Sequence, residues 1–168
     1  MDKKNAVFRY IAYAVEMVLA FVLLSTPNLL PDIFGAKPAL LLGIALSIAT
    51  FEREIPAMIF GMVAGALMDF GYSNALGLFT IALTVVCFLI GWVANNLVKA
   101  NPMNYLLTAA VVIGGLYMLY FGIEFYHVAD RWTYFQAHLI SRMIQSLLWS
   151  AVWYFVNRFV YHTLSEET

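Results

Sequence analysis

The chain has 168 residues, of which 63% are hydrophobic and 11% are charged, and its formal net charge is −1. A soluble domain carries about 25% charged residues. Too few charges are therefore present to cover a water-soluble surface, and the composition predicts an integral membrane protein. The small net charge excludes bulk electrostatic attraction to nucleic acid.

Apolar runs separated by short polar breaks predict an all-α bundle with no soluble domain. A spanning helix needs about 20 apolar residues. The first run is too long for the apolar region of a signal peptide, so we expect it to be retained as a helix. The second run is the shortest, and it could thin the bilayer, begin near Phe34 or be partly re-entrant. The six expected spans are about 6–30, 37–51, 55–71, 73–98, 103–127 and 135–161.

Lysine and arginine set the expected orientation, because cytoplasmic loops carry an excess of both. With a cytoplasmic N-terminus, six of these residues fall on the inner side and two, Lys37 and Arg131, on the outer side. The distribution predicts that both termini lie in the cytoplasm. The six inner residues are Lys3, Lys4, Arg9, Arg53, Lys99 and Arg158.

Two helices carry small residues on one face. In the first, Ala12, Glu16 and Ala20 share a face that could admit another helix. The third begins with Glu52 and Glu54 at the positive end of its dipole. Its face of small residues is Ala57, Gly61, Gly65 and Asp69, each four residues apart.

This second face predicts a close approach to another helix, because glycine and alanine let two backbones pack tightly. The other helix could belong to the bundle or to a partner, and the spacing favours the bundle. Gly71 is expected at the end of the third helix and Gly77 near the start of the fourth. Ser73 or Asn74 could cap the N-terminus of the fourth helix. The single cysteine, Cys87, lies in an apolar run and is expected to be inert packing.

Four charged residues fall within expected spans: Glu16, Asp69, Glu124 and Arg142. Each would cost about 2.5–3.5 kcal/mol at the bilayer centre, so we expect them to face the bundle. Three of them lie in the expected outer half of the membrane, and only Arg142 is positive. We hypothesise that Arg142 pairs with Glu124, with Asp69 or with both.

Polar residues recur along one face of the last helix, at His138, Arg142, Gln145 and Trp149. The simpler interpretation is a stripe of hydrogen bonds between helices, each contributing about 0.6–1.7 kcal/mol. The alternative is a path for protons or a solute.

The third helix and the turn after it resemble a known family. The segment has a helix with glycines four residues apart that ends in aspartate, then a short polar turn, then Leu-Gly opening the next helix. This pattern resembles the rod shape-determining protein MreD family. The residues that carry it are Ala57, Gly61, Gly65, Asp69, Tyr72, Leu76 and Gly77, and Glu16, Pro38 and Arg142 agree with it elsewhere.

The resemblance implies a non-enzymatic, multi-pass protein of the bacterial cell membrane, with no cofactor or metal. Such a protein belongs to the cell-wall elongation (rod) complex and supports cell shape and peptidoglycan synthesis. Its direct partner would be the bitopic protein MreC, with RodA, a class B penicillin-binding protein and MreB as indirect partners. The transmembrane helix of MreC would dock on the Ala57/Gly61/Gly65 face or on the Glu16 face. The family's fold is also thought to be similar to that of energy-coupling-factor substrate-binding subunits.

Two other functions compete with this one. A substrate-binding subunit of an energy-coupling-factor transporter would need an outer pocket, which Glu124, His138, Arg142 and Trp132 could supply. However, such subunits usually show Ala-x-x-x-Ala in the first helix, where this chain has Glu16. An intramembrane enzyme is disfavoured, because no known catalytic motif is present and no second aspartate stands at the depth of Asp69.

Overall fold

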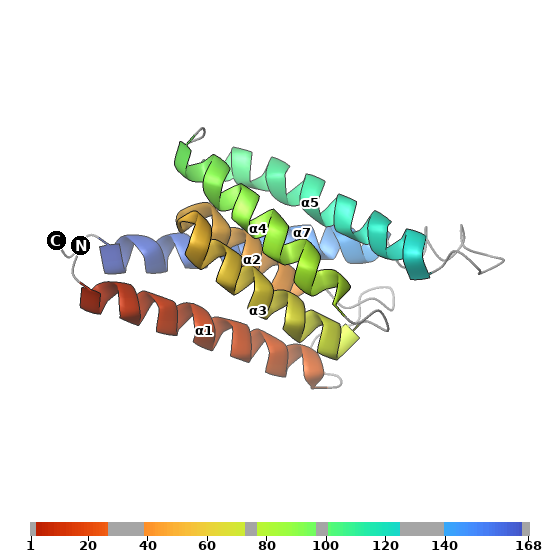
Figure 1. The fold of residues 1–168 in the computed structure, drawn as a ribbon, viewed down its shortest axis with the longest axis horizontal. Helices are drawn as coiled ribbons and strands as arrows, with labels where there is room; N and C mark the ends of the chain where they lie inside the picture. Colours follow the sequence, from red (N-terminus) through yellow and green to blue (C-terminus); the bar gives the residue numbers. More distant parts are fainter. Residues whose placement is uncertain (1–2, 27–38, 73–76, 97–100, 125–139, 166–168) are drawn as a thin grey trace.

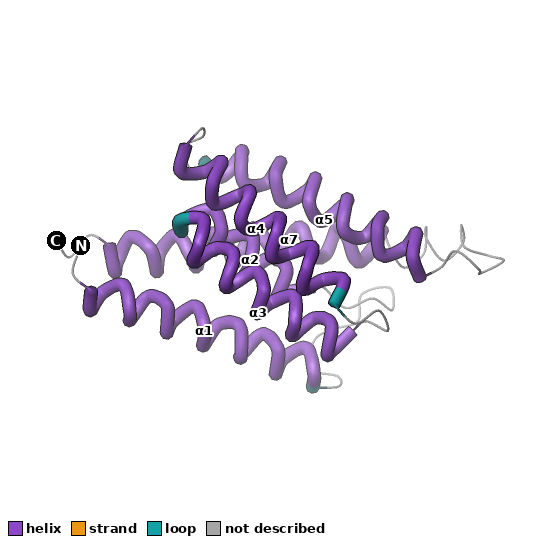
Figure 2. The backbone as a smooth tube through the Cα atoms, in the orientation of Figure 1, coloured by secondary structure: helices purple, strands orange, loops and turns teal. Residues whose placement is uncertain are grey.

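The structure is a computed structural model that describes residues 3–26, 39–72, 77–96, 101–124 and 140–165. The described residues form six helices and no strand (Figures 1 and 2). The all-α prediction is therefore confirmed, and the observed helices overlap the expected spans in order. They are α1 (Lys3–Ser25), α2 (Leu40–Phe51), α3 (Glu54–Tyr72), α4 (Leu78–Asn96), α5 (Pro102–Glu124) and α7 (Ile140–Ser165).

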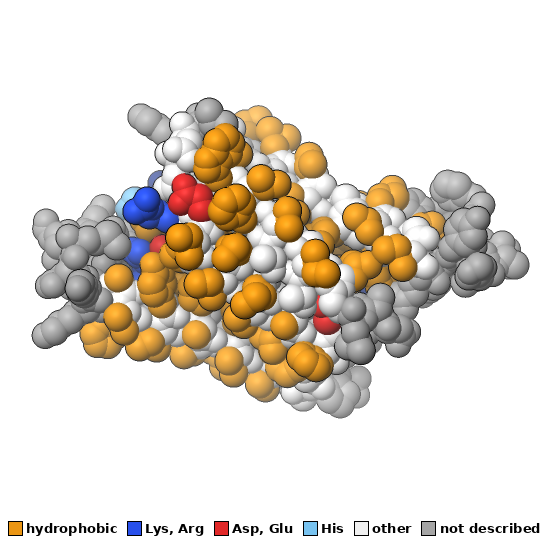
Figure 3. Space-filling view, in the orientation of Figure 1, with side chains coloured by type: hydrophobic (Ala, Val, Ile, Leu, Met, Phe, Trp, Pro, Cys, Tyr) orange, Lys and Arg blue, Asp and Glu red, His pale blue; other side chains and the backbone are white. Residues whose placement is uncertain are grey.

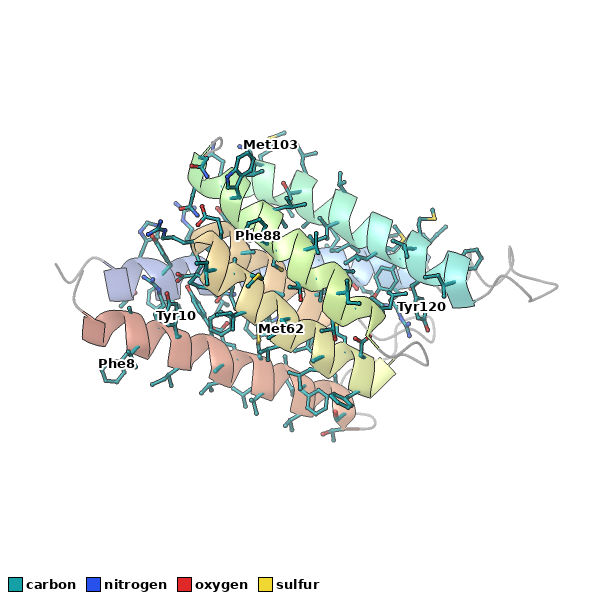
Figure 4. The ribbon with its side chains drawn as sticks, viewed as in Figure 1. Phe8, Tyr10, Met62, Phe88, Met103 and Tyr120 are labelled. Carbon is teal, nitrogen blue, oxygen red and sulfur yellow. The ribbon has the colours of Figure 1, made fainter. Side chains whose placement is uncertain are left out.

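Four of these helices, α1, α3, α4 and α5, are long and apolar enough to cross a membrane. Large hydrophobic side chains are exposed on each of them and on α7. Figure 3 shows such side chains spread over the visible face of the bundle. In Figure 4, Phe8 of α1 points away from the bundle whereas Tyr10, on the same helix, points into it. An apolar outer surface of this kind suits contact with lipid.

The short helix α2 is the centre of the bundle. Every residue from Leu40 to Ala49 is buried, and α2 packs against α1, α3, α4, α5 and α7. A helix that is apolar on nearly all sides suits burial in the protein core as well as contact with lipid, and here protein surrounds it. Its 12 residues, about 18 Å of helix, therefore need not match the thickness of surrounding lipid. The expected extension towards Phe34 lies outside the described residues.

The other helices differ in how extensively they pack against α2 and against one another. The most extensive helix contact is between α3 and α4, which run side by side (Figure 1). By contrast, α5 lies at one edge and packs mainly on α7, with few contacts to α2 and α4. Helix α1 begins, and α7 ends, at the same end of the bundle (Figure 1). Lysine, arginine and histidine side chains gather at that end (Figure 3).

Candidate functional site: a closed seam, a buried ion pair and an open helix face

The α3 face of Ala57, Gly61, Gly65 and Asp69 packs along its whole length against α4, and we call this contact the α3–α4 seam. A Cβ placed on Gly65 would lie 2.5 Å from the Phe79 carbonyl oxygen. One placed on Gly61 would lie 2.7 Å from the Leu83 carbonyl oxygen. Farther along, the Cβ of Ala57 would lie 3.0 Å from a Cβ placed on Gly91 of α4.

The seam is therefore closed within the chain. The helices approach so closely that only glycine fits at two of its positions. Our expectation that this face could receive the helix of a partner is contradicted, because α4 already fills it. Cys87 is fully buried in the same contact, as expected for a packing residue.

Asp69 completes the seam by capping α4. Its carboxylate accepts hydrogen bonds from the backbone N–H groups of Phe79 (3.1 Å) and Thr80 (2.9 Å), and from the Thr80 hydroxyl. The first turn of a helix has N–H groups without partners inside the helix and favours a negative charge. Gly77, with φ of +93°, turns the chain into this first turn in a conformation that suits glycine.

The expected pair between Asp69 and Arg142 is therefore wrong. Both carboxylate oxygens of Asp69 are engaged by α4, and α2 packs against both α3 and α7, on which the two residues lie. The expected caps Ser73 and Asn74 lie outside the described residues. So does the side chain of Glu124, and the Glu124–Arg142 pair stays a hypothesis.

A buried ion pair that the sequence analysis did not foresee joins α1 to the turn after α2. Arg9 and Glu52 are each 3% exposed, and Arg9 Nη2 donates to Glu52 Oε2 at 3.2 Å. The Arg9 guanidinium also lies 4.9 Å from the centre of the Tyr161 ring of α7. Burial raises the pKa of the Glu52 carboxyl, and the neighbouring Arg9 opposes that rise.

Sequence patterns gave little sign of this pair. We expected Arg9 to lie on the cytoplasmic side of the membrane and Glu52 to act on the dipole of the third helix. The two residues are 43 positions apart, and no helical periodicity relates them. The available signal was the position of Glu52 directly after a predominantly apolar helix, which places its carboxylate at the edge of the core.

Helix α7 supplies half of the buried polar and charged residues in the described part of the chain. Ser146, Ser150 and Asn157 are fully buried. The Ser146 hydroxyl accepts from the Ala39 N–H (3.0 Å) and donates to the Arg142 carbonyl (2.7 Å). The Tyr105 hydroxyl lies 3.1 Å from the Ser150 carbonyl oxygen. These bonds tie α7 to α5 and to the start of α2.

The polar face expected on this helix was His138, Arg142, Gln145 and Trp149. Of these, Gln145 is buried, Arg142 is half-buried and Trp149 is exposed, whereas His138 lies outside the described residues. The serines and the asparagine were missed, although Ser146 and Ser150 share a face with Asn157 farther along. Serine gives a weak polar signal in an apolar sequence.

The small-residue face of α1 also turns towards the bundle. Ala20 is fully buried, whereas Ala12 and Glu16 are half-buried at its margin. Helix α1 packs on α7 and α2 through this side, and the Glu16 carboxyl interacts with the Asn157 side chain. A partner helix therefore cannot cover this face as a whole, contrary to our expectation.

One face of small residues remains open, on α5. Thr108, Gly115 and Gly122 recur every seven residues and are all exposed, and no atom lies within 4 Å of a Cβ placed on either glycine. We call these three residues the open α5 stripe. Both glycines are open because α5 packs on α7 through its other side, which carries the buried residues Tyr105, Ala109 and Ile113.

A groove adjoins the stripe where α5 begins. It has a volume of about 380 Å³ and lies between α4 and α5. Its apolar wall includes Leu89, Val93 and Leu107, and Asn104 and Thr108 bring polar atoms to it. At the other end of these helices Tyr120 closes the gap, because its ring lies 5.6 Å from that of Phe79 (Figure 4).

Comparison with known proteins identifies the family of this chain. The family model described as rod shape-determining protein MreD matches residues 4–161, nearly the whole chain. The chain belongs to the MreD family. The resemblance found in the sequence is thus confirmed. The comparison with curated proteins gave no match, and neither did the comparison with solved structures.

Membership of the MreD family and four helices that can span a membrane make the chain a multi-pass membrane protein associated with rod shape. The seam residues and Asp69 lie inside the matched region, and so does the helix that Asp69 caps.

We expect Asp69→Ala to lower the free energy of unfolding by about 1–2 kcal/mol, the upper range for loss of a helix cap. The change leaves the Phe79 and Thr80 N–H groups without an acceptor. The measurement is thermal unfolding in detergent, together with hydrogen exchange at the first turn of α4, which should become faster. Glu54→Gln, at the half-exposed start of α3, is the control. Slow exchange at Phe79 and Thr80 in Asp69→Ala would show that the carboxylate does not cap the helix.

Proposed function

We propose that this chain is a non-enzymatic scaffold of the bacterial cell-wall elongation complex, and that it holds the transmembrane helix of MreC. The observation that carries the proposal is the MreD family match over residues 4–161. RodA, a class B penicillin-binding protein and MreB would be reached indirectly. Cell-shape maintenance and peptidoglycan synthesis would depend on this assembly.

The proposed arrangement in the membrane has six spans, with α2 as a short span inside the bundle and both termini in the cytoplasm. The basic side chains at the end where α1 begins and α7 ends support this orientation (Figure 3). A fold similar to that of energy-coupling-factor substrate-binding subunits is part of the same proposal. In this arrangement the described helices can contact a partner protein only through their lipid-facing surfaces and their short connections.

The open α5 stripe is the surface that we propose for MreC. The two faces first expected to bind it are closed, one by α4 and the other largely by α2 and α7. A small residue every seven positions suits left-handed packing of two helices. Glycine on a lipid-facing surface also permits close backbone contact and the dispersion energy that comes with it.

The groove beside the stripe supports this choice. The groove, with a volume of about 380 Å³, is large enough for side chains that project from a neighbouring helix. A helix lying along Thr108, Gly115 and Gly122 would place such side chains between α4 and α5.

Leucine at the open stripe tests the proposal. We expect Gly115→Leu and Gly122→Leu each to weaken MreC binding by about tenfold, equivalent to 1.4 kcal/mol, because the side chain would hold the two backbones apart. Co-purification with MreC from membranes, followed by titration in lipid discs, measures the loss. Expression and thermal stability should stay unchanged, since nothing lies within 4 Å of a Cβ at either position.

The matched control is Ala14→Leu, which adds a similar side chain at an exposed position of α1. Ala14→Leu should leave MreC binding intact. Full binding by the Gly115→Leu and Gly122→Leu variants would reject the α5 surface, and failure of the unaltered chain to bind MreC at all would reject the proposed function.

A further inference from the structure

The groove between α4 and α5 is polar at one end and apolar along its length. Asn101 and Asn104 lie at the polar end, where α5 begins. The apolar part is lined by Leu89 and Val93 of α4 and by Leu107 of α5. These three side chains are exposed, so the groove opens onto the apolar outer surface of the bundle, the surface that suits contact with lipid.

The hydroxyl protons along the groove are already donated to the protein. The Thr50 hydroxyl donates to the Leu46 carbonyl (2.9 Å), and the Thr108 hydroxyl donates to the Asn104 carbonyl (2.8 Å). The Tyr105 hydroxyl donates to a carbonyl oxygen of α7, 3.1 Å away. A solute with hydrogen-bonding groups would find no free donor among these hydroxyls, whereas a hydrocarbon chain needs none.

The groove is also confined to one leaflet of the membrane. At its far end the Tyr120 ring lies 5.6 Å from the Phe79 ring and closes the gap between the helices. Leu89 lies seven residues before Asn96, where α4 ends, which is about 10 Å along the helix. One leaflet contributes about 15 Å of hydrocarbon. Apolar walls that stay unfilled lose their dispersion contacts, and the material that surrounds this groove is hydrocarbon chains.

The polar end of the groove suits a negative charge. Helix α5 begins at Pro102, and its first backbone bond runs from the Tyr105 N–H to the Asn101 carbonyl oxygen (3.0 Å). The N–H groups of Met103 and Asn104 therefore have no acceptor inside the helix, and no acidic residue lies in its first turn. Phosphate is an anion that such a helix end binds well.

This polar end lies at the basic end of the bundle. The Asn95 amide, near the end of α4, donates to the Glu52 backbone carbonyl at 3.1 Å, and Glu52 pairs with Arg9 near the start of α1. The start of α1 marks the end where basic side chains gather (Figure 3), which is cytoplasmic in the proposed orientation. A phospholipid lies in a membrane in the same sense as the groove, with its polar group outermost and its chains directed towards the bilayer centre.

We propose that this groove binds one phospholipid of the cytoplasmic leaflet, with an acyl chain between α4 and α5 and its phosphate at the first turn of α5. An acyl chain and the side chains of an MreC helix cannot fill the same groove. The lipid therefore belongs to the chain without MreC, and its binding requires no partner protein.

The test uses the full chain in mild detergent after its native lipid has been exchanged away, with dioleoylphosphatidylglycerol as the probe. Native mass spectrometry counts the probe molecules bound to each chain over a titration. The unaltered chain should bind one phosphatidylglycerol before any others. Dioleoylglycerol, which has the same chains and no phosphate, should bind about tenfold more weakly, because the charge-assisted bonds of the phosphate are lost.

A substitution in the apolar part of the groove tests the place of the acyl chain. Ala94 lines the groove and is half-buried, so the ring of Ala94→Phe would occupy the space of the chain. We expect this variant to bind phosphatidylglycerol about tenfold more weakly or worse. Its matched control is Ala14→Phe, at an exposed position of α1, which should bind the probe as the unaltered chain does.

A substitution at the polar end tests the place of the phosphate. Asn104→Asp puts a negative charge beside it and should weaken binding by about tenfold. The same charge is favourable at the N-terminus of a helix, so this variant should keep its fold. Its control is Asn96→Asp, which adds the charge at an exposed position of α4 outside the groove and should leave binding unchanged.

Unfolding midpoints in the same detergent show which variants are folded, and Asn104→Asp decides alone if Ala94→Phe does not fold. The proposal is overturned if the unaltered chain holds no more probe than folded Ala94→Phe, or if the diacylglycerol binds as tightly as the phospholipid. Equal binding by Asn104→Asp and Asn96→Asp would overturn it as well. MreC is absent from every arm, so this proposal and the proposed function can fail separately.

Discussion

Gly65→Ala should lower the free energy of unfolding by about 3 kcal/mol, the upper end for overpacking a tight contact. The added Cβ would lie 2.5 Å from the Phe79 carbonyl oxygen and 2.5 Å from the Thr80 Cα. Both are backbone atoms of α4, so relief requires the two helices to separate. Separation would also strain the Asp69 cap at the same turn. Chemical or thermal unfolding in detergent measures the loss.

Gly115→Ala is the control for this substitution. It makes the same chemical change on α5, where no atom lies within 4 Å of the new Cβ. Since alanine is about 1 kcal/mol better than glycine inside a helix, Gly115→Ala should be neutral or slightly stabilising. An equal unfolding midpoint for Gly65→Ala and Gly115→Ala would mean that the α3–α4 seam is looser than described.

Breaking the buried ion pair is the second change with a large expected effect. Arg9→Met should lower the free energy of unfolding by about 3–5 kcal/mol, because it leaves the Glu52 carboxylate buried without an opposite charge. Glu52→Leu should cost a similar amount by stranding Arg9. The double variant Arg9→Met/Glu52→Leu should recover most of the loss, since two apolar side chains of similar volume can replace a buried pair.

A double-mutant cycle of unfolding free energies in detergent measures this coupling. The control is Arg53→Met, one position after Glu52 but exposed, and surface substitutions of this kind usually stay within about 0.5 kcal/mol. Additive losses in the double variant would mean that Arg9 and Glu52 stabilise the fold independently and that their pairing contributes little.

The third helix shows which contacts a sequence pattern can predict and which it cannot. The spacing of Ala57, Gly61, Gly65 and Asp69 predicted a close helix contact and an acid that needs a partner, and both features are present. The spacing did not say which helix makes the contact. The aspartate was expected to meet Arg142, a residue of opposite charge, whereas it meets the N–H groups of α4. A sequence pattern describes one face, and the complementary face has no periodicity of its own to reveal it.

Glycines in apolar helices have opposite roles in this chain. Gly61 and Gly65 are enclosed by α4, whereas Gly115 and Gly122 are open. All four occur in long apolar helices, and they differ in spacing: Gly61 and Gly65 are four residues apart, whereas Gly115 and Gly122 are seven apart. Likewise, Arg9 and Arg53 look equivalent as basic residues near helix ends, but one is buried in an ion pair and the other is exposed.

The sequence by itself determined that the chain is a membrane protein of the MreD family, with helices in the order that the described residues show. Few charges and long apolar runs are sufficient for the class and the helices, and the glycine and aspartate motif is sufficient for the family. Only the tertiary structure decided which faces meet: α3 with α4, Arg9 with Glu52, Glu16 with Asn157, and α5 left open. The physical reason is that lipid and protein interior are equally apolar, so hydrophobicity marks a helix for the membrane without marking the side that turns inward.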